Sequence, residues 1–505
     1  MAAPTSPALL LRADAGPKVG SGHASRLLAL ARAWTASGGR AVLLTTNPST
    51  ALKARAAEAG ADIVPLPASH PDEADLSTVL TAIKDEGGAP WIAVDGYSYD
   101  AAYLNALRAA GARVLAVDDT ARLADYPADA FLNQNPGAEA REHPLRPETL
   151  PLLGPRWSLL RPGFAEAGAR RSFPAQAARV LISFGGADSG NAAAAVLRAL
   201  HRLKLPFEAV ALVGSDNPHA EELQRASAGL PVRLERDADV PARMAWADVA
   251  VIGGGVTMLE ACAAGLPALV ATLADNQEPG AAALAARGAM RPLGKASDFS
   301  EAILAEKIAA LLGDRAAREA LSKAGRAVAD GSGAARVVAA LRALSAAKLS
   351  NRDVRLRPAG PDDAVEIWRI ANEPSVRAHS FRKEPIPLAA HLNWYRALLA
   401  DGAQRFWLME AGGVVAGQIR YAKAGDEAEV HYSVRAAFRG KGLGTLALAL
   451  SKPLACAELG ARALKGAVIK PNEPSERSFL SAGWSRRGEE TRDGRACAVF
   501  EAACS

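Results

Sequence analysis

The sequence predicts an α/β protein with two successive doubly wound parallel sheets, followed by a separate α+β domain. Short apolar runs alternate with alanine-rich helical stretches over about two thirds of the chain, which is typical of strand–helix–strand units. Near residue 350 longer strand-like segments replace this pattern. The length of 505 residues fits roughly three domains rather than one. We therefore expect domains at 1–165, 166–350 and 351–505.

The strands of the two parallel sheets are expected where apolar runs end in small or polar residues. In the first domain these runs are ALLLRA, AVLLTT, WIAVDG and RVLAVDD. In the second domain they are ARVLISFGG, FEAVALVG, VRLE and DVAVIGGG. The segment 152–176 contains proline, glycine and arginine without a clear period, so we interpret it as a linker.

Composition excludes several classes of protein. Hydrophobic residues make up 50% of the chain and the net charge is only +5, which indicates a globular protein and disfavours a dedicated nucleic-acid binder. Cysteines 262, 456, 497 and 504 form no CxxC pair, so we expect neither a zinc site nor a disulfide framework, and a reducing, cytoplasmic setting. No signal peptide or membrane span of about 20 apolar residues is expected.

The first glycine-bounded turn, DAGPKVGSGHASR, places a histidine where a helix is about to begin. Gly20 and Gly22 allow tight backbone conformations and close approach of a ligand. In an open α/β sheet the ligand crevice lies at the carboxyl ends of the strands, where this turn falls. His23 is therefore a candidate general base that takes a proton from water. The alternative is a histidine that only caps the helix.

A second glycine turn follows the strand DVAVIGGG. Gly253, Gly254 and Gly255 precede a helix that we expect to begin near Thr257, so backbone N–H groups there could bind a diphosphate. The alternative is a plain strand–turn–helix with glycines for tight packing. The turn lacks the GxGxxG and GK[ST] patterns of dinucleotide and P-loop sites. Other polar or glycine residues expected at the same crevice are Glu260, Asn276, Gln277, Gly185 and Gly186.

One stretch of the C-terminal domain carries a phosphate-binding pattern, and a second motif follows it. The stretch SVRAAFRGKGLGTLALAL holds Arg439, Gly442 and Gly444 in an RxxGxG arrangement between a strand and a helix. About thirty residues later comes NEPSERSFLSAGW. In the strand AEVHYSV, Glu429 and His431 alternate on one face and are candidate bases, or else part of a solvated strand face.

Residues 8–345 resemble the UDP-sugar hydrolases of pseudaminic acid biosynthesis, which have a GT-B-like pair of Rossmann-type domains. GSGHASR, SFGGADSGN, GGGVTMLEACAAGLP and ADNQ carry the resemblance in order, with VDGYSYD, AVDD and FLNQNPGA. The resemblance implies that His23 activates water and that Asn276 orients the substrate. It implies that Gly255, Thr257 and Glu260 hold the diphosphate and ribose, and that no metal is needed. Further implied substrate or UDP contacts are Asp14, Gly22, Arg26, Tyr97, Gly185, Gly186, Gly254 and Gln277.

The C-terminal stretches resemble the GNAT acetyltransferases, which use acetyl-CoA as co-substrate. The acetyl-CoA contacts that this resemblance implies are Val434, Arg439, Gly440, Lys441, Gly442, Gly444, Thr445, Asn472 and Ser475. Many GNAT members have a tyrosine acid where this chain has Phe479, so the acid could be another tyrosine, a water or none. Residues 372–399 are expected to cover the acceptor pocket, where His379, His391 and Trp394 are candidate sugar contacts, or else core or surface residues.

Together the resemblances imply a bifunctional enzyme of nucleotide-sugar metabolism. The C-terminal domain would acetylate the 4-amino group of a UDP-linked amino sugar. The N-terminal module would hydrolyse the resulting UDP-2,4-diacetamido-2,4,6-trideoxy-β-L-altropyranose. One alternative is a GT-B glycosyltransferase, for flagellin or cell-surface glycosylation, fused to an acetyltransferase. Another is a UDP-sugar-sensing module fused to a protein acetyltransferase. Oligomeric state and the choice between the pseudaminic and legionaminic branches are not readable from the sequence.

Overall fold

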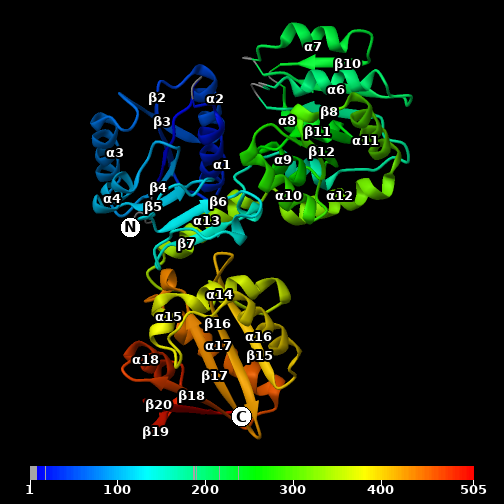
Figure 1. Cartoon of the computed structure of the whole chain (residues 1–505). Helices are drawn as coiled ribbons and strands as arrows, with labels where there is room; N and C mark the ends of the chain where they lie inside the picture. Colours follow the sequence, from blue (N-terminus) through cyan, green and yellow to red (C-terminus); the bar gives the residue numbers. More distant parts are fainter. Residues whose placement is uncertain are drawn as a thin grey trace. The chain divides into compact units, whose positions relative to one another are not determined.

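The computed structural model describes residues 8–16, 19–185, 188, 190–214, 217–236 and 238–504. The chain divides into two compact units. The first unit comprises residues up to 144 and residues 151–337, and the second comprises residues 145–150 and 338 onward. Figure 1 colours the chain along the sequence and labels the elements used below. None of the helices in the described ranges is both long and apolar enough to cross a membrane.

The first sheet of unit 1 has the strand order β3-β2-β1-β4-β5-β6-β7. Its strands are β1 (Leu9–Arg12), β2 (Ala41–Thr46), β3 (Ala61–Leu66), β4 (Trp91–Asp95), β5 (Arg113–Val117), β6 (Ala130–Asn133) and β7 (Leu150–Leu153). Its helices are α1 (Gly22–Ala36), α2 (Thr50–Glu58), α3 (Glu73–Glu86) and α4 (Ala101–Ala109). Strand order reverses between β1 and β4, which pair in parallel. The carboxyl ends of these two strands therefore border the crevice where α/β proteins bind ligands.

The second sheet of unit 1 repeats this plan in the order β10-β9-β8-β11-β12-β13. Its strands are β8 (Arg179–Ser183), β9 (Glu208–Leu212), β10 (Val232–Glu235), β11 (Val249–Gly253), β12 (Ala268–Thr272) and β13 (Arg291–Lys295). The helices from this half onward are α5 (Phe164–Ala169), α6 (Ala192–Leu200), α7 (Ala220–Ser227), α8 (Val240–Trp246), α9 (Thr257–Ala263), α10 (Glu278–Ala286), α11 (Glu301–Gly313), α12 (Arg315–Val328) and α13 (Gly333–Ser345).

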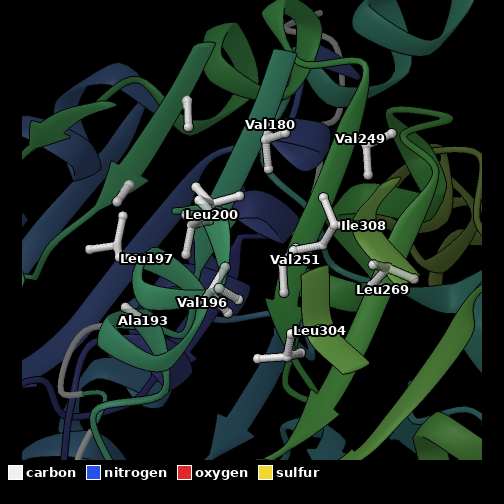
Figure 2. Packing of buried hydrophobic residues seen from close by; sticks show 14 of the residues in the cluster. Val180, Ala193, Val196, Leu197, Leu200, Val249, Val251, Leu269, Leu304 and Ile308 are labelled. Carbon is white, nitrogen blue, oxygen red and sulfur yellow. The ribbon is translucent and has the colours of Figure 1, made fainter. Parts of the chain in front are cut away.

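The core of this second half lies between β8, β11 and β12 on one side and helices α6 and α11 on the other. The strands are buried along almost their whole length, because both faces of a parallel sheet are covered by helices. Figure 2 shows Leu197 of α6 and Ile308 of α11 among the strand side chains Val180, Val251 and Leu269. All five side chains are at most 1% exposed.

The predicted linker at 152–176 is not an unstructured connection. It contains the last residues of β7, a short 3-10 helix at Pro155–Trp157 and helix α5, which packs against α8 and α9. Phe164 is fully buried, and the Arg171 guanidinium donates hydrogen bonds to the carbonyls of Met244, Ala247 and Ala264. The proline and glycine content concealed these contacts, because they depend on elements far along the chain.

The sheet of unit 2 is mixed, with the order β14-β15-β16-β17-β18-β20-β19. Its strands are β14 (Val354–Pro358), β15 (Gln404–Ala411), β16 (Val414–Ala424), β17 (Glu427–Val434), β18 (Ala463–Ile469), β19 (Ser485–Arg492) and β20 (Arg495–Ala503). Its helices after α13 are α14 (Ala364–Asn372), α15 (Pro374–Ala378), α16 (Leu388–Ala400), α17 (Leu443–Leu459) and α18 (Glu473–Ser481). Parallel pairing of β17 with β18 runs only from Glu427 to Glu429, after which the two strands separate.

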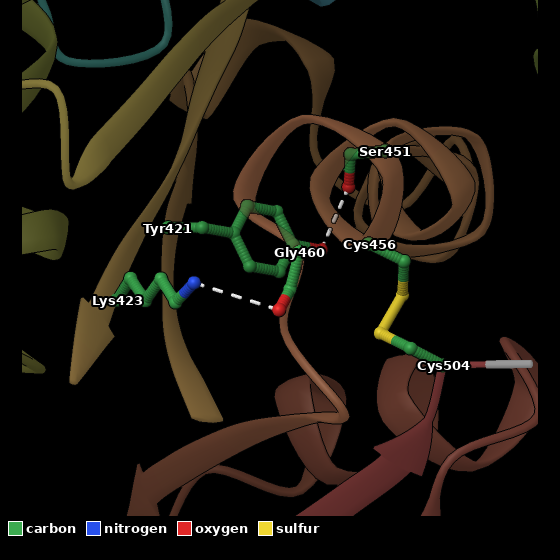
Figure 3. The surroundings of a disulfide bond; sticks show 6 residues. All are labelled: Tyr421, Lys423, Ser451, Cys456, Gly460 and Cys504. Carbon is green, nitrogen blue, oxygen red and sulfur yellow. Dashed lines mark hydrogen bonds between the residues drawn. A yellow bond between two sulfur atoms is a disulfide. The ribbon is translucent and has the colours of Figure 1, made fainter. Parts of the chain in front are cut away.

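A disulfide in unit 2 contradicts the expectation that the cysteines stay unpaired. Cys456 of α17 and Cys504, which follows β20, are bonded across a sequence separation of 48 residues, with their Cα atoms 5.5 Å apart (Figure 3). No local CxxC pattern predicts this pair, because only the folded structure brings α17 and the residue after β20 together. Cys262 and Cys497 are free and buried.

Two isoleucines of α11 offer a matched test of this packing. Ile308 is fully buried, whereas Ile303 on the same helix is 54% exposed. We expect Ile308→Ala to lower the free energy of unfolding by about 3 kcal/mol, because it leaves a cavity between α11 and the sheet. Ile303→Ala should cost about 0.5 kcal/mol or less. Urea unfolding of the two variants measures the difference, and equal losses would contradict this placement of α11.

Candidate active sites

The first candidate site lies at the switch point between β1 and β4. His23 is the second residue of α1, and Asp95 is the last residue of β4. His23 Nδ1 lies 2.7 Å from Asp95 Oδ1, and Asp95 is 1% exposed. Arg26 Nη2 also lies 3.0 Å from Nδ1, so the tautomer decides which partner this nitrogen uses. In the tautomer with its proton on Nδ1, the ring donates to Asp95 and Nε2 carries the lone pair, as in a general base.

A guanidinium and a second carboxylate complete this cluster. Arg26 Nε and Nη2 donate to the two oxygens of Asp95 at 2.9 and 2.8 Å, and Arg26 Nη1 donates to Asp119 at 3.0 Å. The Tyr97 hydroxyl donates to the other Asp119 oxygen at 3.0 Å, and its ring stands edge-on to His23. Partial burial and the Asp119 carboxylate raise the pKa of Tyr97 to about 12, so the phenol stays protonated at neutral pH.

The structure thus brings His23, Arg26 and Tyr97 together through two residues that sequence reasoning did not assign. Asp95 ends the run WIAVD, and Asp119 follows the run RVLAVDD. Both follow buried strands of one parallel sheet, and this placement was the signal that could have identified them.

Two other predicted residues of the first half have different surroundings. Asp14 binds the Arg12 guanidinium and accepts hydrogen bonds from the backbone and hydroxyl of Thr46. Burial acts to raise the pKa of Asp14, but Arg12 and Thr46 outweigh it and the pKa lies below its usual range. Asp14 therefore has a structural network of its own. Gly22 is the first residue of α1 and has open space where a side chain would be.

The second half places its predicted residues around the turn after β11. A Cβ on Gly254 would lie 3.0 Å from Gln277, whose Oε1 already accepts a hydrogen bond from the Leu273 backbone. Gln277 therefore supports the turn. Gly255 borders open space, and Thr257 is the first residue of α9. Burial raises the pKa of Glu260, and the Arg161 guanidinium partly offsets this effect.

Two other predicted residues of this half, Asn276 and Gly185, lie within the described ranges. Asn276 lies in an exposed 3-10 helix at Asp275–Gln277, and no hydrogen bond joins it to the His23 cluster within the described residues. Gly185 has the left-handed φ of 82° and follows β8. Gly186 lies outside the described residues. Within the described residues, the predicted residues of the second half therefore form fewer contacts with one another than those of the His23 cluster do.

The second candidate site is a cavity of about 1710 Å³ in unit 2, beside the point where β17 leaves β18. Gly442 caps α17 in the left-handed conformation, with φ of 81°. A Cβ on Gly444 would meet Ser478 Oγ at 3.1 Å and the Tyr432 ring at 3.2 Å, so glycine keeps this approach open. Asn472 caps α18 by accepting a hydrogen bond from the Ser475 backbone. Predicted residues that line the cavity are His431, Val434, Arg439, Gly440, Gly442, Gly444, Thr445, Asn472 and Ser475.

Two residues predicted for this site point elsewhere. The Lys441 ammonium donates to the carbonyls of Leu344 and Ala346 at 2.9 and 2.7 Å, so its charge serves the end of α13 and not the cavity. Glu429 binds the Arg492 guanidinium and does not line the cavity. The structure therefore does not place Glu429 where it could act as a base in the cavity.

The remaining predicted base, His431, faces the cavity opposite Arg420. The two residues are directly paired across β16 and β17. The His431 side chain is exposed on the cavity wall, yet desolvation by the protein around it is the main cause that lowers its pKa to about 4. Arg420 and Arg492 lower this pKa further, and Glu429 opposes them. The imidazole is consequently neutral at physiological pH.

The packing around Phe479 explains why a tyrosine does not fit at this position. Phe479 is 2% exposed and stacks on Phe500 at a centroid distance of 4.8 Å. A Cβ on Gly466 would lie 2.5 Å from the tip of the Phe479 ring, so a hydroxyl on that tip would run into β18. Tyr432 is the tyrosine that lines the described cavity, and its hydroxyl lies 2.8 Å from Ser475 Oγ.

Unit 1 is a pair of Rossmann-type domains, and unit 2 is an α+β domain with a cavity where two of its strands separate. Residues 353–485 match the family described as acetyltransferase (GNAT) domain. The predicted fold class, two Rossmann-type parallel sheets followed by an α+β GNAT domain, is confirmed. Over 195 residues the chain is 28% identical to the spore coat polysaccharide biosynthesis protein SpsG of Bacillus subtilis (strain 168). This match covers 38% of the chain and 58% of the length of SpsG.

Solved structures resemble both parts of the chain. MurG of Acinetobacter baumannii is 17% identical, with a TM-score of 0.48 over 66% of this chain and 99% of MurG. The aminoglycoside acetyltransferase AAC(6')-Ib, solved with ribostamycin and coenzyme A, is 17% identical with a TM-score of 0.28 over 30% of this chain and 93% of that enzyme. The spermidine N-acetyltransferase of Vibrio cholerae, solved with CoA and spermine, is 15% identical with a TM-score of 0.28 over 30% of this chain and 96% of that enzyme.

The lowered pKa of His431 predicts a pH dependence of stability. The unfolded chain binds this proton near the ordinary pKa of 6.5, whereas the folded chain binds it only near pH 4. Stability is therefore lost as pH falls from about 6.5 towards 4. In His431→Gln this contribution is absent, so its melting temperature should fall less steeply over that range. Calorimetric melting at several pH values measures both slopes, with His201→Gln as the control, and parallel curves for wild type and His431→Gln would contradict the prediction.

Proposed function

We propose that unit 1 hydrolyses a UDP-linked diacetamido sugar and that unit 2 N-acetylates its 4-amino precursor. The proposed substrate of unit 1 is UDP-2,4-diacetamido-2,4,6-trideoxy-β-L-altropyranose. The observation that carries the hydrolase proposal is the pair of His23 and the buried Asp95, which with the proton on Nδ1 leaves His23 Nε2 as a proton acceptor at the crevice of the sheet. The similarity to a spore coat polysaccharide biosynthesis protein supports a sugar substrate.

In the proposed hydrolysis, Nε2 of His23 takes a proton from water while the water oxygen attacks the anomeric carbon. The bond between this carbon and the diphosphate oxygen breaks, and UDP leaves with the electron pair. Asp95 stabilises the imidazolium that forms, as the acidic member of a catalytic triad does. Backbone N–H groups of the glycine turn at 253–255 would hold the diphosphate, and Glu260 would accept hydrogen bonds from ribose hydroxyls.

The cavity of unit 2 fits acetyl-CoA as co-substrate. The first N–H groups of a helix have no partner inside the helix, and the residues at the start of α17, Gly442 to Thr445, line the cavity. These N–H groups would hold the pyrophosphate, with Asn472 and Ser475 beside the rest of the molecule. When bound, acetyl-CoA supplies an acetyl thioester. On the acceptor side the cavity is lined by Arg377, Arg382 and Arg420 against Glu384, a net positive surface that suits an amine attached to a nucleoside diphosphate.

Incubation of the purified protein with the 4-amino UDP-sugar and acetyl-CoA tests both activities at once. We expect the wild type to release the free diacetamido sugar and UDP. His23→Ala should accumulate the acetylated UDP-sugar, with hydrolysis slowed by about 10²- to 10⁴-fold, because general-base catalysis is lost. In ¹⁸O-labelled water the label should enter the sugar and not UDP. UDP release that requires an added acceptor would favour a glycosyltransferase, and acetylation of polypeptides alone would favour a sensing module.

Asp95→Asn tests the orientation of His23 separately. The amide leaves the histidine in place but no longer fixes the proton on Nδ1, and we expect hydrolysis to fall by about 10³-fold. Acetyl transfer by unit 2 should be unchanged, and a thermal melt of the full chain reports whether unit 1 is still folded. Asp62→Asn, at a 72% exposed side chain, is the matched control. Hydrolysis within twofold of wild type in Asp95→Asn would remove Asp95 from the mechanism.

A further inference from the structure

One edge of the Arg420 guanidinium is open to the cavity of unit 2. Nη1 of Arg420, which lies on β16, donates to Gln404 Oε1 at 2.8 Å. Nε and Nη2 donate to no group in the described part of the chain, and neither atom is closed off by the protein. Arg420 also forms no ion pair within these ranges, whereas Arg435 and Arg439 share the carboxylate of Glu373. Two N–H donors of a cavity-lining cation are therefore available to a ligand.

The open edge is the one that can hold two oxygens of a single anion. The N–H groups of Nε and Nη2 point in parallel, and their spacing matches two oxygens of a carboxylate or a phosphate. Unit 1 shows this edge in use, because Arg26 Nε and Nη2 donate to the two oxygens of Asp95 at 2.9 and 2.8 Å. The hydrogen bond of Nη1 to Gln404 fixes the Arg420 guanidinium and leaves the same edge for a ligand.

Arg420 lies in the middle of a row of side chains on the cavity face of the sheet. It is directly opposite Phe406 of β15 and His431 of β17, and all three line the cavity. Neighbouring strands are about 4.8 Å apart, so the three side chains are in contact range of one ligand. Trp394 of α16 is 44% exposed, and the guanidinium lies 5.7 Å from its ring centroid. A ligand over this row meets one positive charge between two uncharged rings, because His431 has a pKa of about 4.

Nearby protein groups do not neutralise this charge. Burial lowers the pKa of Arg420, and the Glu429 carboxylate partly opposes this effect. That carboxylate is itself bound by Arg492. The described lining of the cavity holds five arginines and only two glutamates, of which Glu473 is paired with Arg477. A charge partly removed from water needs a counter-ion, so we expect the ligand to bring the negative charge.

Acetyl-CoA is expected at a different level of β17. Its pyrophosphate is expected at the start of α17, which follows Val434, the last residue of β17. His431 lies three residues before Val434, about 10 Å along the strand. Arg420, opposite His431, lies one strand further from β18. The anion that Arg420 binds is therefore expected on the acceptor and not on acetyl-CoA.

We propose that the open edge of Arg420 binds an oxyanion of the acetyl acceptor, so that unit 2 selects amines that carry a phosphate or carboxylate group. This inference rests on the proposed acetyl transfer and names the substrate class of its acceptor. In a UDP-linked amino sugar the oxyanion is a phosphate of the diphosphate. A neutral amine leaves Arg420 without a counter-ion, and a polyamine adds further positive charge, so both are poor acceptors.

Substitutions at Arg420 separate its charge from its geometry. In Arg420→Met the charge is lost but an unbranched chain stays against Trp394, and kcat/KM for an anionic amine should fall about 10- to 100-fold, mainly through KM. Arg420→Lys keeps the charge without the two parallel donors and should lie between Arg420→Met and wild type. Neither variant should change the KM for acetyl-CoA or for a neutral amine. Arg405→Met on β15 is the matched control, because Arg405 binds Glu458 and does not line the cavity.

The full-length protein is assayed with four amines: the 4-amino UDP-sugar, glucosamine 6-phosphate, muramic acid and glucosamine. The wild type should prefer the phosphate and carboxylate amines to glucosamine, and Arg420→Met should lose this preference. A wild type that favours glucosamine 6-phosphate over muramic acid identifies the bound group as a phosphate, and the reverse identifies a carboxylate. Acetylation of glucosamine 6-phosphate but not of the UDP-sugar rejects the proposed sugar acceptor and keeps the oxyanion subsite. Equal kcat/KM for charged and neutral amines in the wild type, or a preference that persists in Arg420→Met, overturns the subsite.

Binding is also followed in the absence of acetyl-CoA. Because the Arg420 guanidinium lies over the Trp394 ring, an oxyanion bound there should change the fluorescence of this tryptophan. Glucosamine 6-phosphate is titrated into wild type and Trp394→Phe, and the difference between the two signals isolates Trp394 from the other tryptophans. A saturable difference that is weakened in Arg420→Met supports the subsite, provided that both proteins melt at the wild-type temperature. An equal response in Arg420→Met, or no response in wild type, overturns it.

Discussion

The buried carboxylate of Asp95 is the constraint on which the first unit depends. A carboxylate that is 1% exposed needs positive or hydrogen-bonding partners, and β4 delivers it to the one edge of the sheet where α1 can supply them. Arg26 and His23 lie three residues apart on α1, so one turn of helix presents both to Asp95. Arg26 also binds Asp119. Two carboxylates against one guanidinium leave one negative charge, which balances the proton that His23 takes up in the proposed hydrolysis.

In unit 2 the site is formed by a gap in the sheet and not by a cluster of charges. β17 and β18 stop pairing after Glu429, so the residues of β17 beyond this point have no partner strand on that side. The cavity lies beside this gap in the sheet. Gly466 lets Phe479 close the far side of this opening, and the resulting close contact is incompatible with a phenol at that position. The Tyr432 phenol fills the cavity side instead and is held by Ser475. The departure of this chain from the usual GNAT pattern is therefore linked to the packing of β18.

The sequence predicted the sheets, the glycine turns and His23, because these follow from local patterns of apolar runs and small residues. It did not predict which carboxylates join this cluster. Asp95 lies 72 residues from His23 and Asp119 lies 93 residues from Arg26, and only the strand order brings them together. Nor could it separate Asp119 from Asp118, whose carboxylate is used by Thr120, Ala121 and Tyr126. The direction of a long side chain also depends on residues far along the chain. Lys441 was expected at acetyl-CoA, and its ammonium instead donates to a carbonyl at the end of α13.

The pairing of polar atoms separates structural groups from groups that await a ligand. In the His23 cluster the charges of Asp95, Asp119 and Arg26 satisfy one another. In unit 2 the Glu429 carboxylate is likewise bound by Arg492, whereas His431 lines the cavity.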